Sequence, residues 1–491
     1  MRSKIKSILR FFLVMSLFFA FAAAQPARAA DGVVQPPCNN AAFDTALNSV
    51  QGSGGGTITF NCGAAATIIF STTRIITTPV TILGEGKITL SGGNAVRLFE
   101  VSANGILTLD DVTVSAGLKS DGNGGAILNY YGEVYIQNSR FTGNQTGALW
   151  SGGAIESFGK LVITDSEFTN NQAGNGGALF LRFEEGDATI TNTIFRDNQT
   201  TNTMDGWGGV ILLWDGADVT IEDSLLESNQ AKEGGAIHNS FQNSSITLTD
   251  VTLSANYAKF GGGIFNTGTA TMTGVTFSNN STLFDGGGIY NDGTVTLTGV
   301  TLSRNHAKRG GGIINHGSAT LTNVTLSSND ADWEGGGITN GDWMALKNVT
   351  LHGNTADDNT NGIYAAAGFI FLENTVIAGS YGENCNQNTG AHLISLGFNL
   401  SDDDTCSAYF NQVGDRNSMD AWLGALEDYG GLTLTHLPFP NSPLVDGGQC
   451  QASIPTDQRG ITRPQGAACD IGAVERRANE QKLIYLPVVL R

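Results

Sequence analysis

The 491-residue chain combines few charged residues with a clear acidic excess. Charged residues make up 14% of it, about half the usual share, and the formal net charge is −19. So acidic a surface repels nucleic acids and anionic membranes, which excludes both as electrostatic partners. With 65 glycines against 10 prolines, two classes stay open, a low-complexity chain and a repetitive one.

Residues 1–29 are predicted to form a signal peptide, so we expect a mature protein that is secreted and is extracellular or at the cell surface. A basic start precedes the apolar run 11–24, and Ala27 and Ala29 form a small-x-small cleavage site. An uncleaved anchor is the alternative, although a membrane span needs a longer run of about 20 residues. No later stretch is apolar enough for a transmembrane helix, so we expect no span in the mature chain.

Residues 30–56 are predicted to form an N-terminal cap. Phe43, Ala46, Leu47 and Val50 recur at helical spacing, which indicates a short amphipathic helix. If the repeats that follow stack into coils, their open end exposes a sheet edge that needs a cover. This helix precedes the repeats and is suited to that role.

A di-glycine followed by a small and an aliphatic residue recurs between residues 57 and 384. Consecutive copies are 24 to 32 residues apart. Self-similarity at such a period is typical of a solenoid. The copies begin at Gly124, Gly152, Gly176, Gly208, Gly234, Gly261, Gly286, Gly310 and Gly335.

An asparagine that follows a Phe or Leu by three residues forms a second motif. Counting back from it, apolar residues fall at −10, −8, −5 and −3. Steps of two are those of a strand, and the step of three marks a bend between two strands. We expect these asparagines to form a stacked structural ladder: Asn144, Asn171, Asn198, Asn229, Asn256, Asn280, Asn305, Asn329 and Asn354.

Together the two motifs predict an all-β fold over residues 57–384. The bend gives two strands and the di-glycine opens a third, so each coil of about 25 residues has three short strands. Stacked about 4.8 Å apart, such coils make a single-stranded right-handed parallel β-helix. Beyond residue 385 the repeat dissolves, and residues 385–475 are predicted to form an irregular C-terminal cover, followed by a tail, 476–491.

Six cysteines form three pairs that are close in sequence. Disulfides are expected in an oxidising compartment, and pairing of near neighbours is the simplest of 15 connectivities. None of the pairs has the spacing of a zinc or redox site, so we interpret them as staples at the two ends. The pairs are Cys38 with Cys62, Cys385 with Cys406, and Cys450 with Cys469.

Three neighbouring coils depart from the repeat and carry long inserts with aromatic and charged residues. Ser157, Leu181 and Leu213 stand there in place of the usual Asn. Aromatic platforms with carboxylates suit sugar recognition, and a carboxylate pair could act as acid and base. The alternative is that the aromatic residues only pack the inserts down. The candidate ligand-binding residues are Glu156, Arg182, Glu184, Glu185, Asp205, Trp207, Trp214 and Asp215.

Other polar residues indicate no cofactor, metal or assigned catalytic group. The six histidines lack metal-ligand spacing, and His238 and His316 are expected to be polar surface residues. Asp402, Asp403 and Asp404 are interpreted as solvated turn acids rather than calcium ligands, because no loop of defined ligand spacing surrounds them.

Two parts of the chain resemble known families. Gly124–Ile127 with Phe141–Asn144, and the copies up to residue 362, resemble the repeats of polymorphic outer membrane proteins. That resemblance implies a surface-exposed β-helix associated with adhesion. Ser442–Gly448, Thr456–Gly460 and Asp470–Glu475 look like the choice-of-anchor Q domain, which implies the C-terminal closure of an exported β-helix.

The leading hypothesis is a non-catalytic secreted or cell-surface protein for adhesion or glycan binding, with an extracellular polysaccharide or a cell-surface partner. β-Helices of the pectin-lyase-like type are also the scaffold of polysaccharide lyases and glycoside hydrolases. An enzyme of that kind, with its site on the inserts of residues 150–218, is the alternative. A purely structural coat protein is a third hypothesis.

Overall fold

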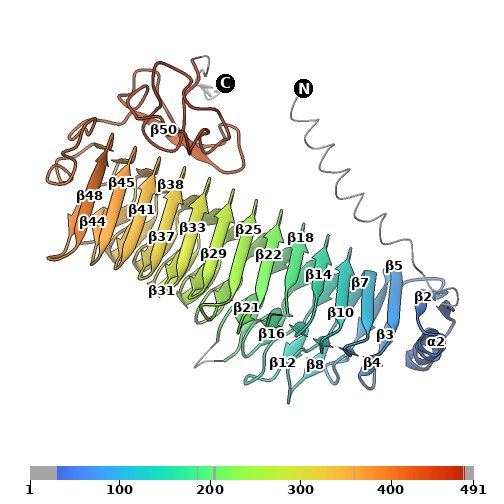
Figure 1. Cartoon of the computed structure of the whole chain (residues 1–491). Helices are drawn as coiled ribbons and strands as arrows, with labels where there is room; N and C mark the ends of the chain where they lie inside the picture. Colours follow the sequence, from blue (N-terminus) through green and yellow to red (C-terminus); the bar gives the residue numbers. More distant parts are fainter. Residues whose placement is uncertain (1–29, 185, 203–205, 359, 479, 481–491) are drawn as a thin grey trace, which may run out of the picture.

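The chain folds into a right-handed parallel β-helix of about 15 turns with almost no helix. This computed structural model describes residues 30–480 except 185, 203–205, 359 and 479. The predicted signal peptide and residues 481–491 of the tail lie outside the described residues. Figure 1 shows the coils stacked into a rod, with the N-terminal coils at one end and the last coils at the other.

The first two strands of each coil build two of the sheets that run along the rod, and both pair in parallel throughout. β5 and β7 are long enough to bend from the first sheet into the second. The first sheet contains β1 (Gly32–Val34), β2 (Gly56–Phe60), β5 (Pro79–Ser91), β7 (Ile106–Ser115), β10 (Glu133–Gln137), β14 (Leu161–Thr164), β18 (Ala188–Thr191), β22 (Asp218–Glu222), β25 (Ser245–Thr249), β29 (Thr269–Thr273), β33 (Thr294–Thr298), β37 (Ser318–Thr322), β41 (Trp343–Lys347), β45 (Phe369–Glu373) and β48 (His392–Gly397). The second contains β3 (Ala66–Ile69), β11 (Arg140–Thr142), β15 (Glu167–Thr169), β19 (Ile194–Arg196), β23 (Leu225–Glu227), β26 (Thr252–Ser254), β30 (Thr276–Ser278), β34 (Thr301–Ser303), β38 (Thr325–Ser327), β42 (Thr350–His352), β46 (Val376–Ala378) and β49 (Leu400–Ser401).

The segment after the ladder asparagine adds a fourth strand to many coils, beyond the three expected. There the chain stays extended between the Asn and the di-glycine and pairs with the next coil, as Ser281 does with His306. These third-sheet strands are β8 (Leu118–Lys119), β12 (Gln145–Thr146), β16 (Gln172–Ala173), β20 (Gln199–Thr200), β27 (Tyr257–Phe260), β31 (Ser281–Asp285), β35 (His306–Arg309), β39 (Asp330–Glu334) and β43 (Thr355–Ala356).

The strands that follow the di-glycines form a fourth sheet, which carries the site described below. It contains β4 (Arg74–Ile76), β6 (Phe99–Val101), β9 (Ile127–Asn129), β13 (Ile155–Ser157), β17 (Leu179–Arg182), β21 (Ile211–Trp214), β24 (Ile237–Asn239), β28 (Ile264–Asn266), β32 (Ile289–Asn291), β36 (Ile313–Asn315), β40 (Ile338–Asn340), β44 (Thr360–Ala365) and β47 (Glu383–Gln387).

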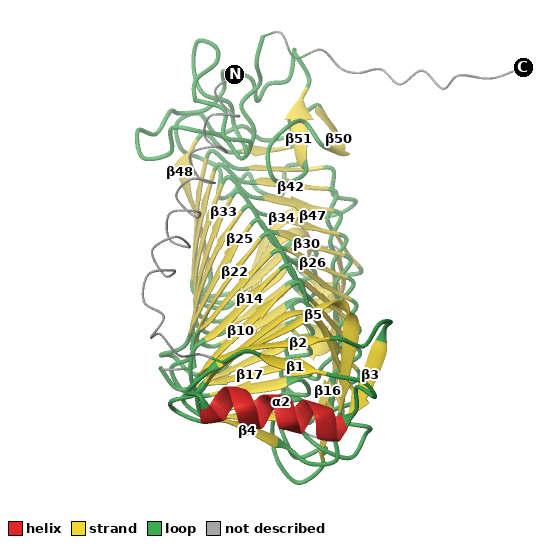
Figure 2. Ribbon diagram, turned by 90° about the vertical axis from the view of Figure 1, so that its right-hand side faces the viewer, coloured by secondary structure: helices red, strands yellow, loops and turns green. Residues whose placement is uncertain are grey.

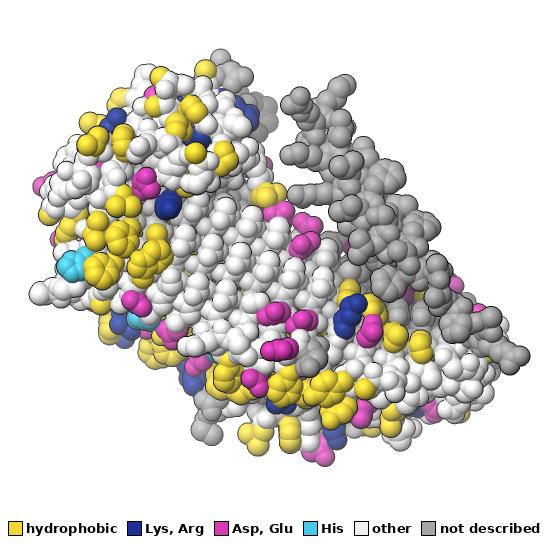
Figure 3. Space-filling view, viewed as in Figure 1, with side chains coloured by type: hydrophobic (Ala, Val, Ile, Leu, Met, Phe, Trp, Pro, Cys, Tyr) yellow, Lys and Arg dark blue, Asp and Glu magenta, His cyan; other side chains and the backbone are white. Residues whose placement is uncertain are grey.

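Inward side chains of successive coils lie directly above one another and fill the rod. Phe141, Phe168 and Phe195 pair in register, are fully buried and stack with ring centroids 4.7 and 5.1 Å apart. These separations match the spacing of neighbouring strands, about 4.8 Å. Outside, the first sheet presents mainly Thr and Ser, and Figure 3 shows a broad surface that is neither charged nor hydrophobic, with hydrophobic side chains gathered in separate patches.

The asparagine motif forms a continuous buried ladder. From Asn144 to Asn354, each Nδ2 donates to Oδ1 of the next Asn at 2.9–3.1 Å. Each also donates to a backbone carbonyl of the preceding coil, as Asn280 does to Leu253 at 2.9 Å. A second ladder joins Asn239, through three further residues, to Asn340 at 2.7–2.8 Å. Buried amides that are paired in this way fix the turns of the coil.

The two glycines of each pair meet different steric demands. The first has a positive φ, for example +66° at Gly208 and Gly234, a region that L side chains rarely adopt. At the second, Gly209, an added Cβ would overlap the carbonyl oxygen of Gly235 in the next coil. Only glycine satisfies the second demand, so the motif recurs in the nine coils that begin at Gly124 to Gly335.

The N-terminal end of the rod is covered by α2 (Asn40–Gly52), and Figure 2 shows this helix lying across the first coils. Its buried residues are Phe43, Ala46, Leu47 and Val50, the four that predicted it. Asn39 caps it by accepting from the backbone N–H of Ala42 at 3.0 Å. The disulfide Cys38–Cys62 ties this region to the turn after β2.

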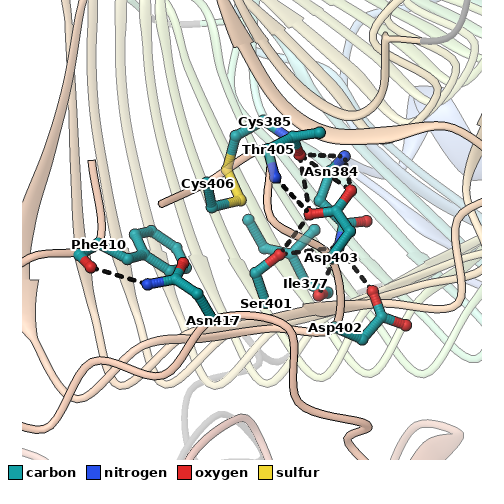
Figure 4. The surroundings of a disulfide bond; sticks show 10 residues. All are labelled: Ile377, Asn384, Cys385, Ser401, Asp402, Asp403, Thr405, Cys406, Phe410 and Asn417. Atoms are coloured by element: carbon teal, nitrogen blue, oxygen red, sulfur yellow. Dashed lines mark hydrogen bonds between the residues drawn. A yellow bond between two sulfur atoms is a disulfide. The ribbon is translucent and has the colours of Figure 1, made fainter. Parts of the chain in front are cut away.

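The opposite end is closed by a short turn rather than by the whole region 385–475. β47, β48 and β49 still belong to the stack, and Phe410 then packs on the core beside the Cys385–Cys406 disulfide. Figure 4 shows Asp403 at the centre of this turn, where its carboxylate accepts from Ser401, Thr405 and the backbone N–H of Asn384 at 2.8–3.2 Å. Asp403 is therefore a structural acceptor and not a solvated turn acid.

The remainder of the C-terminal region docks on the side of the rod, over the second sheet (Figure 1). Gln458 Nε2 donates to Thr301 Oγ1 at 2.8 Å, and Gln458 Oε1 accepts from Thr325 at 2.7 Å. His436 Nε2 lies 2.9 Å from Ser327 Oγ. Within this region β50 (Leu423–Glu427) pairs with β51 (Thr435–Pro438), and Cys450 is bonded to Cys469. Most of the region that was predicted to cover the rod end, after Phe410 and up to residue 475, therefore docks on the side of the rod. We call this part the lateral clasp.

Replacing a ladder residue should destabilise the rod strongly. Asn280→Ala removes four hydrogen bonds and leaves both the backbone N–H and the side-chain amide of Asn256 without this acceptor. At about 1–3 kcal/mol for each unsatisfied group, we expect urea denaturation to show a loss of at least about 3 kcal/mol. Asn411→Ala, at an exposed position, is the control and should change stability by less than about 0.5 kcal/mol.

The lateral clasp should loosen in mild acid through His436. Burial and, to a smaller extent, the neighbouring His352 together lower the pKa of His436 to about 4. Since a released histidine protonates near pH 6.5, the contribution of His436 to docking is full above pH 6.5 and is lost as the pH falls towards 4, by on the order of 3 kcal/mol. Hydrogen exchange of β51 at pH 7.5 and 5 measures this.

Asp470 has the opposite dependence, because burial raises its pKa to about 7. Its contribution to docking is full in acid and is lost as the pH rises from about 4 to about 7, so it opposes the contribution of His436 over much of the same pH range. The His436→Gln variant separates the two contributions. Docking in this variant should strengthen as the pH falls from 7.5 to 5, because only the Asp470 contribution remains, and the difference from the wild type isolates His436. An acid response equal to that of the wild type would refute the assignment to His436.

Candidate functional site

The candidate site lies on the outer face of the fourth sheet, next to the last of the three coils that carry inserts. In each strand the flanking residues point inward and the middle one points outward. The outward residues of β13, β17, β21 and β24 are nevertheless buried, which shows that the inserts cover this part of the face. These four residues are Glu156, Phe180, Leu212 and His238.

A column of stacked rings crosses this face. His238, Phe265 and Tyr290 share one register, and their ring centroids are 4.8 and 4.5 Å apart with interplanar angles of 5° and 6°. Trp207 continues the column, 5.5 Å from both His238 and Trp214. Because the rings cover one another's faces, the inner members of the column present mainly their edges.

Next to this column the inserts leave a hollow of about 750 Å³. Its aromatic wall is formed by Trp207, Trp214, Phe241 and Phe265. Phe241 is 43% exposed and stands edge-on to Trp214, with centroids 4.6 Å apart. The other lining residues are Glu233, His238, Ser240, Gln242, Asn243, Thr267 and Asp292.

The polar wall contains a connected group of side chains. His238 Nε2 lies 3.2 Å from Glu233 Oε2, and His238 Nδ1 lies 2.6 Å from Ser240 Oγ. Burial lowers the pKa of His238, and the Glu233 carboxylate acts in the opposite direction. The imidazole is therefore neutral near pH 7, with both ring nitrogens hydrogen-bonded.

The hollow has an acidic lining. Glu233 and Asp292 contribute carboxylates. Tyr290, in the adjoining column, remains a neutral hydroxyl because burial, with smaller contributions from Asp292 and Asp285, raises its pKa to about 12. The site is thus suited to an uncharged or cationic ligand with apolar faces and several hydroxyl groups.

The predicted residues Glu156 and Arg182 lie outside the hollow, under the inserts of earlier coils. The Glu156 carboxylate is 3% exposed and accepts from Asn123 at 2.8 Å, with Arg182 Nη1 3.6 Å away. Burial raises the pKa of Glu156, while Asn123 and Arg182 oppose that shift. The Arg182 guanidinium also lies 5.1 Å from the ring centroids of Phe158 and Phe183. This cluster packs the inserts down, as the alternative interpretation expected.

Of the other predicted residues, Trp207 and Trp214 line the hollow. Glu184 and Asp215 are exposed and do not line it. Glu185 and Asp205 lie outside the described residues. The structure therefore brings together two of the eight candidate side chains at one cavity.

Sequence reasoning missed most of the hollow. His238 was expected at the polar surface but is 4% exposed, because Trp207 from the preceding insert stacks on it; His316 is exposed as expected. One sequence signal could have indicated the ring column. His238, Phe265 and Tyr290 each stand one residue before an Asn of the second ladder, and this position points outward in every copy.

Within the described part of the chain, no group of three or more His, Cys, Asp or Glu side chains is placed to hold a metal ion. Over the same residues, no helix has the length and apolarity that a membrane crossing requires.

Comparison with known proteins agrees with the fold. A family model for the right-handed β-helix region matches residues 94–290, a stretch that contains every lining residue of the hollow except Asp292. No curated protein matches the chain, and no solved structure matches it. The match to the family model agrees with the right-handed parallel β-helix seen in the structure.

The insert cluster generates a stability prediction. Arg182→Ala leaves the buried Glu156 without its ion-pair partner, and we expect thermal unfolding to show destabilisation of about 1–3 kcal/mol, since Arg182 is partly exposed. Glu156→Gln retains an acceptor for Asn123 and should cost less. Equal losses in the two variants, or none in either, would contradict this account of the cluster.

Proposed function

We propose that this protein is a secreted or cell-surface β-helix protein that binds a glycan in the hollow between β21 and β28. The observation that carries the proposal is the pairing of Trp214 and Phe241 with amide and hydroxyl side chains in one open cavity. Sugar rings have apolar faces that pack on aromatic side chains and a rim of hydroxyl groups that need hydrogen-bond partners. Gln242 and Asn243 supply such partners.

Charge limits the class of glycan. Glu233 and Asp292 line the hollow, and the chain has a net charge of −19. A polyuronate would be repelled by both. We therefore favour a neutral glycan or one with amino sugars, and this preference also weighs against a pectin-degrading role.

A lyase or glycosidase on the inserts is the less favoured alternative. The carboxylate best placed for it, Glu156, is almost fully buried and is engaged by Asn123 and Arg182. An acid–base pair must reach both sides of a glycosidic bond, which Glu156 in this position does not do.

Binding can be tested on the full mature chain with an array of neutral, amino-sugar and uronate glycans, followed by calorimetry on the ligands found. Trp214→Ala should weaken binding tenfold or more, because it removes the ring against which Phe241 packs. Uronate glycans should bind least.

Trp343→Ala is the matched control. Trp343 is exposed on β41 and lies 6.2 Å from Phe371, in an aromatic cluster on the first sheet. Its removal should leave affinity unchanged. Loss of binding in Trp343→Ala together with full binding in Trp214→Ala would place the ligand on the first sheet instead of the hollow and would contradict the proposal.

A further inference from the structure

Three side chains in the polar wall of the hollow form a hydrogen-bonded relay. Ser240 Oγ lies 2.6 Å from His238 Nδ1, and His238 Nε2 lies 3.2 Å from Glu233 Oε2. With Nε2–H donated to the carboxylate, Nδ1 carries the free lone pair that accepts the serine proton. This is the order of roles, hydroxyl, imidazole and carboxylate, by which a serine is activated as a nucleophile.

Local structure brings the three residues together. His238 and Ser240 are two residues apart where β24 ends, so both side chains point outward. Glu233 immediately precedes Gly234, whose φ of +66° turns the chain sharply and places the carboxylate beside the imidazole. Trp207 stacks on the ring of His238 and holds it in place.

We propose that this relay hydrolyses ester-linked acyl groups, such as O-acetyl groups, on a glycan held in the hollow, with Ser240 as nucleophile, His238 as general base and acid, and Glu233 as positioning residue. The inference rests on the proposed glycan site for its substrate, while the ester chemistry can be measured without a glycan.

Each step balances with water as the only other reactant. Ser240 Oγ attacks the acyl carbon and its proton passes to His238 Nδ1. The bond from that carbon to the glycan oxygen then breaks, and His238 returns the proton to this oxygen. Water next attacks the acyl-serine, its proton passes through His238 to Ser240 Oγ, and a carboxylic acid leaves.

Donors for the developing oxyanion are available in the same cavity. The side-chain amides of Gln242 and Asn243 line it. Preorganised N–H groups of this kind stabilise a tetrahedral intermediate.

The direct test uses the full mature chain with 4-nitrophenyl acetate and with O-acetylated cello-oligosaccharides, and follows nitrophenol and acetate release. A fluorophosphonate probe, which labels activated serines, is followed by mass spectrometry. We expect hydrolysis and a single label on Ser240, and Ser240→Ala should abolish the label and lower the rate at least about a hundredfold.

Ser254→Ala, on β26 in the second sheet, is the matched control and should keep both rate and label. Full activity in Ser240→Ala, or absence of label and hydrolysis in the wild type, would overturn the inference. If glycan binding that depends on Trp214 persists in that second case, the proposed binding function stands while the esterase does not.

The Glu233→Gln variant tests the positioning role. Glu233 raises the pKa of His238, so its neutralisation should move the acid limb of the pH–rate profile to lower pH. Lys232, 3.9 Å from Glu233, and Asp292 across the hollow are the other charged groups nearby. An unchanged acid limb would show that Glu233 does not act through His238.

Discussion

Parallel stacking in register, at the spacing of one strand, is the constraint on which the whole molecule depends. It places every side chain directly above its counterpart in the neighbouring coil. Residue types that stack well on themselves therefore recur at the same position of successive coils, and those that would clash are not found there. Buried asparagines become ladders, phenylalanines become columns, and the second glycine of each pair leaves room for the next backbone. The rod is the sum of these columns, since each coil contacts mainly its neighbours.

The same constraint shapes the proposed site. Leu181 and Leu213 stand at positions where the second ladder would have asparagine. The turns of these coils carry longer inserts, which cover part of the outer face of the fourth sheet and border the hollow. The rings of His238 and Phe265 stack only because strands in register hold them 4.8 Å apart. The fixed spacing of the strands thus builds the stacked rings on one side of the hollow, and the irregular turns beside them carry the side chains that we propose for binding and catalysis.

Most of the fold could be predicted from the sequence because its signals repeat nine times along the rod. The coil, the helix over the first coil and the three disulfides are confirmed, and the Asn ladder follows the predicted residues. The hollow could not be found in this way, because Trp214 and Phe241 approach one another through insert conformations that occur once. Likewise, no sequence repeat signals the lateral docking of Gln458 on Thr301.

Hydrogen exchange on the protein, with and without the tightest binder among cello-, manno- and chito-oligosaccharides, tests the central claim most directly. The account predicts slower exchange in residues 207–214, 237–243 and 264–267, which surround the hollow, and no change along β41 and β45. Protection confined to the first sheet, or firm binding without protection around the hollow, would contradict it.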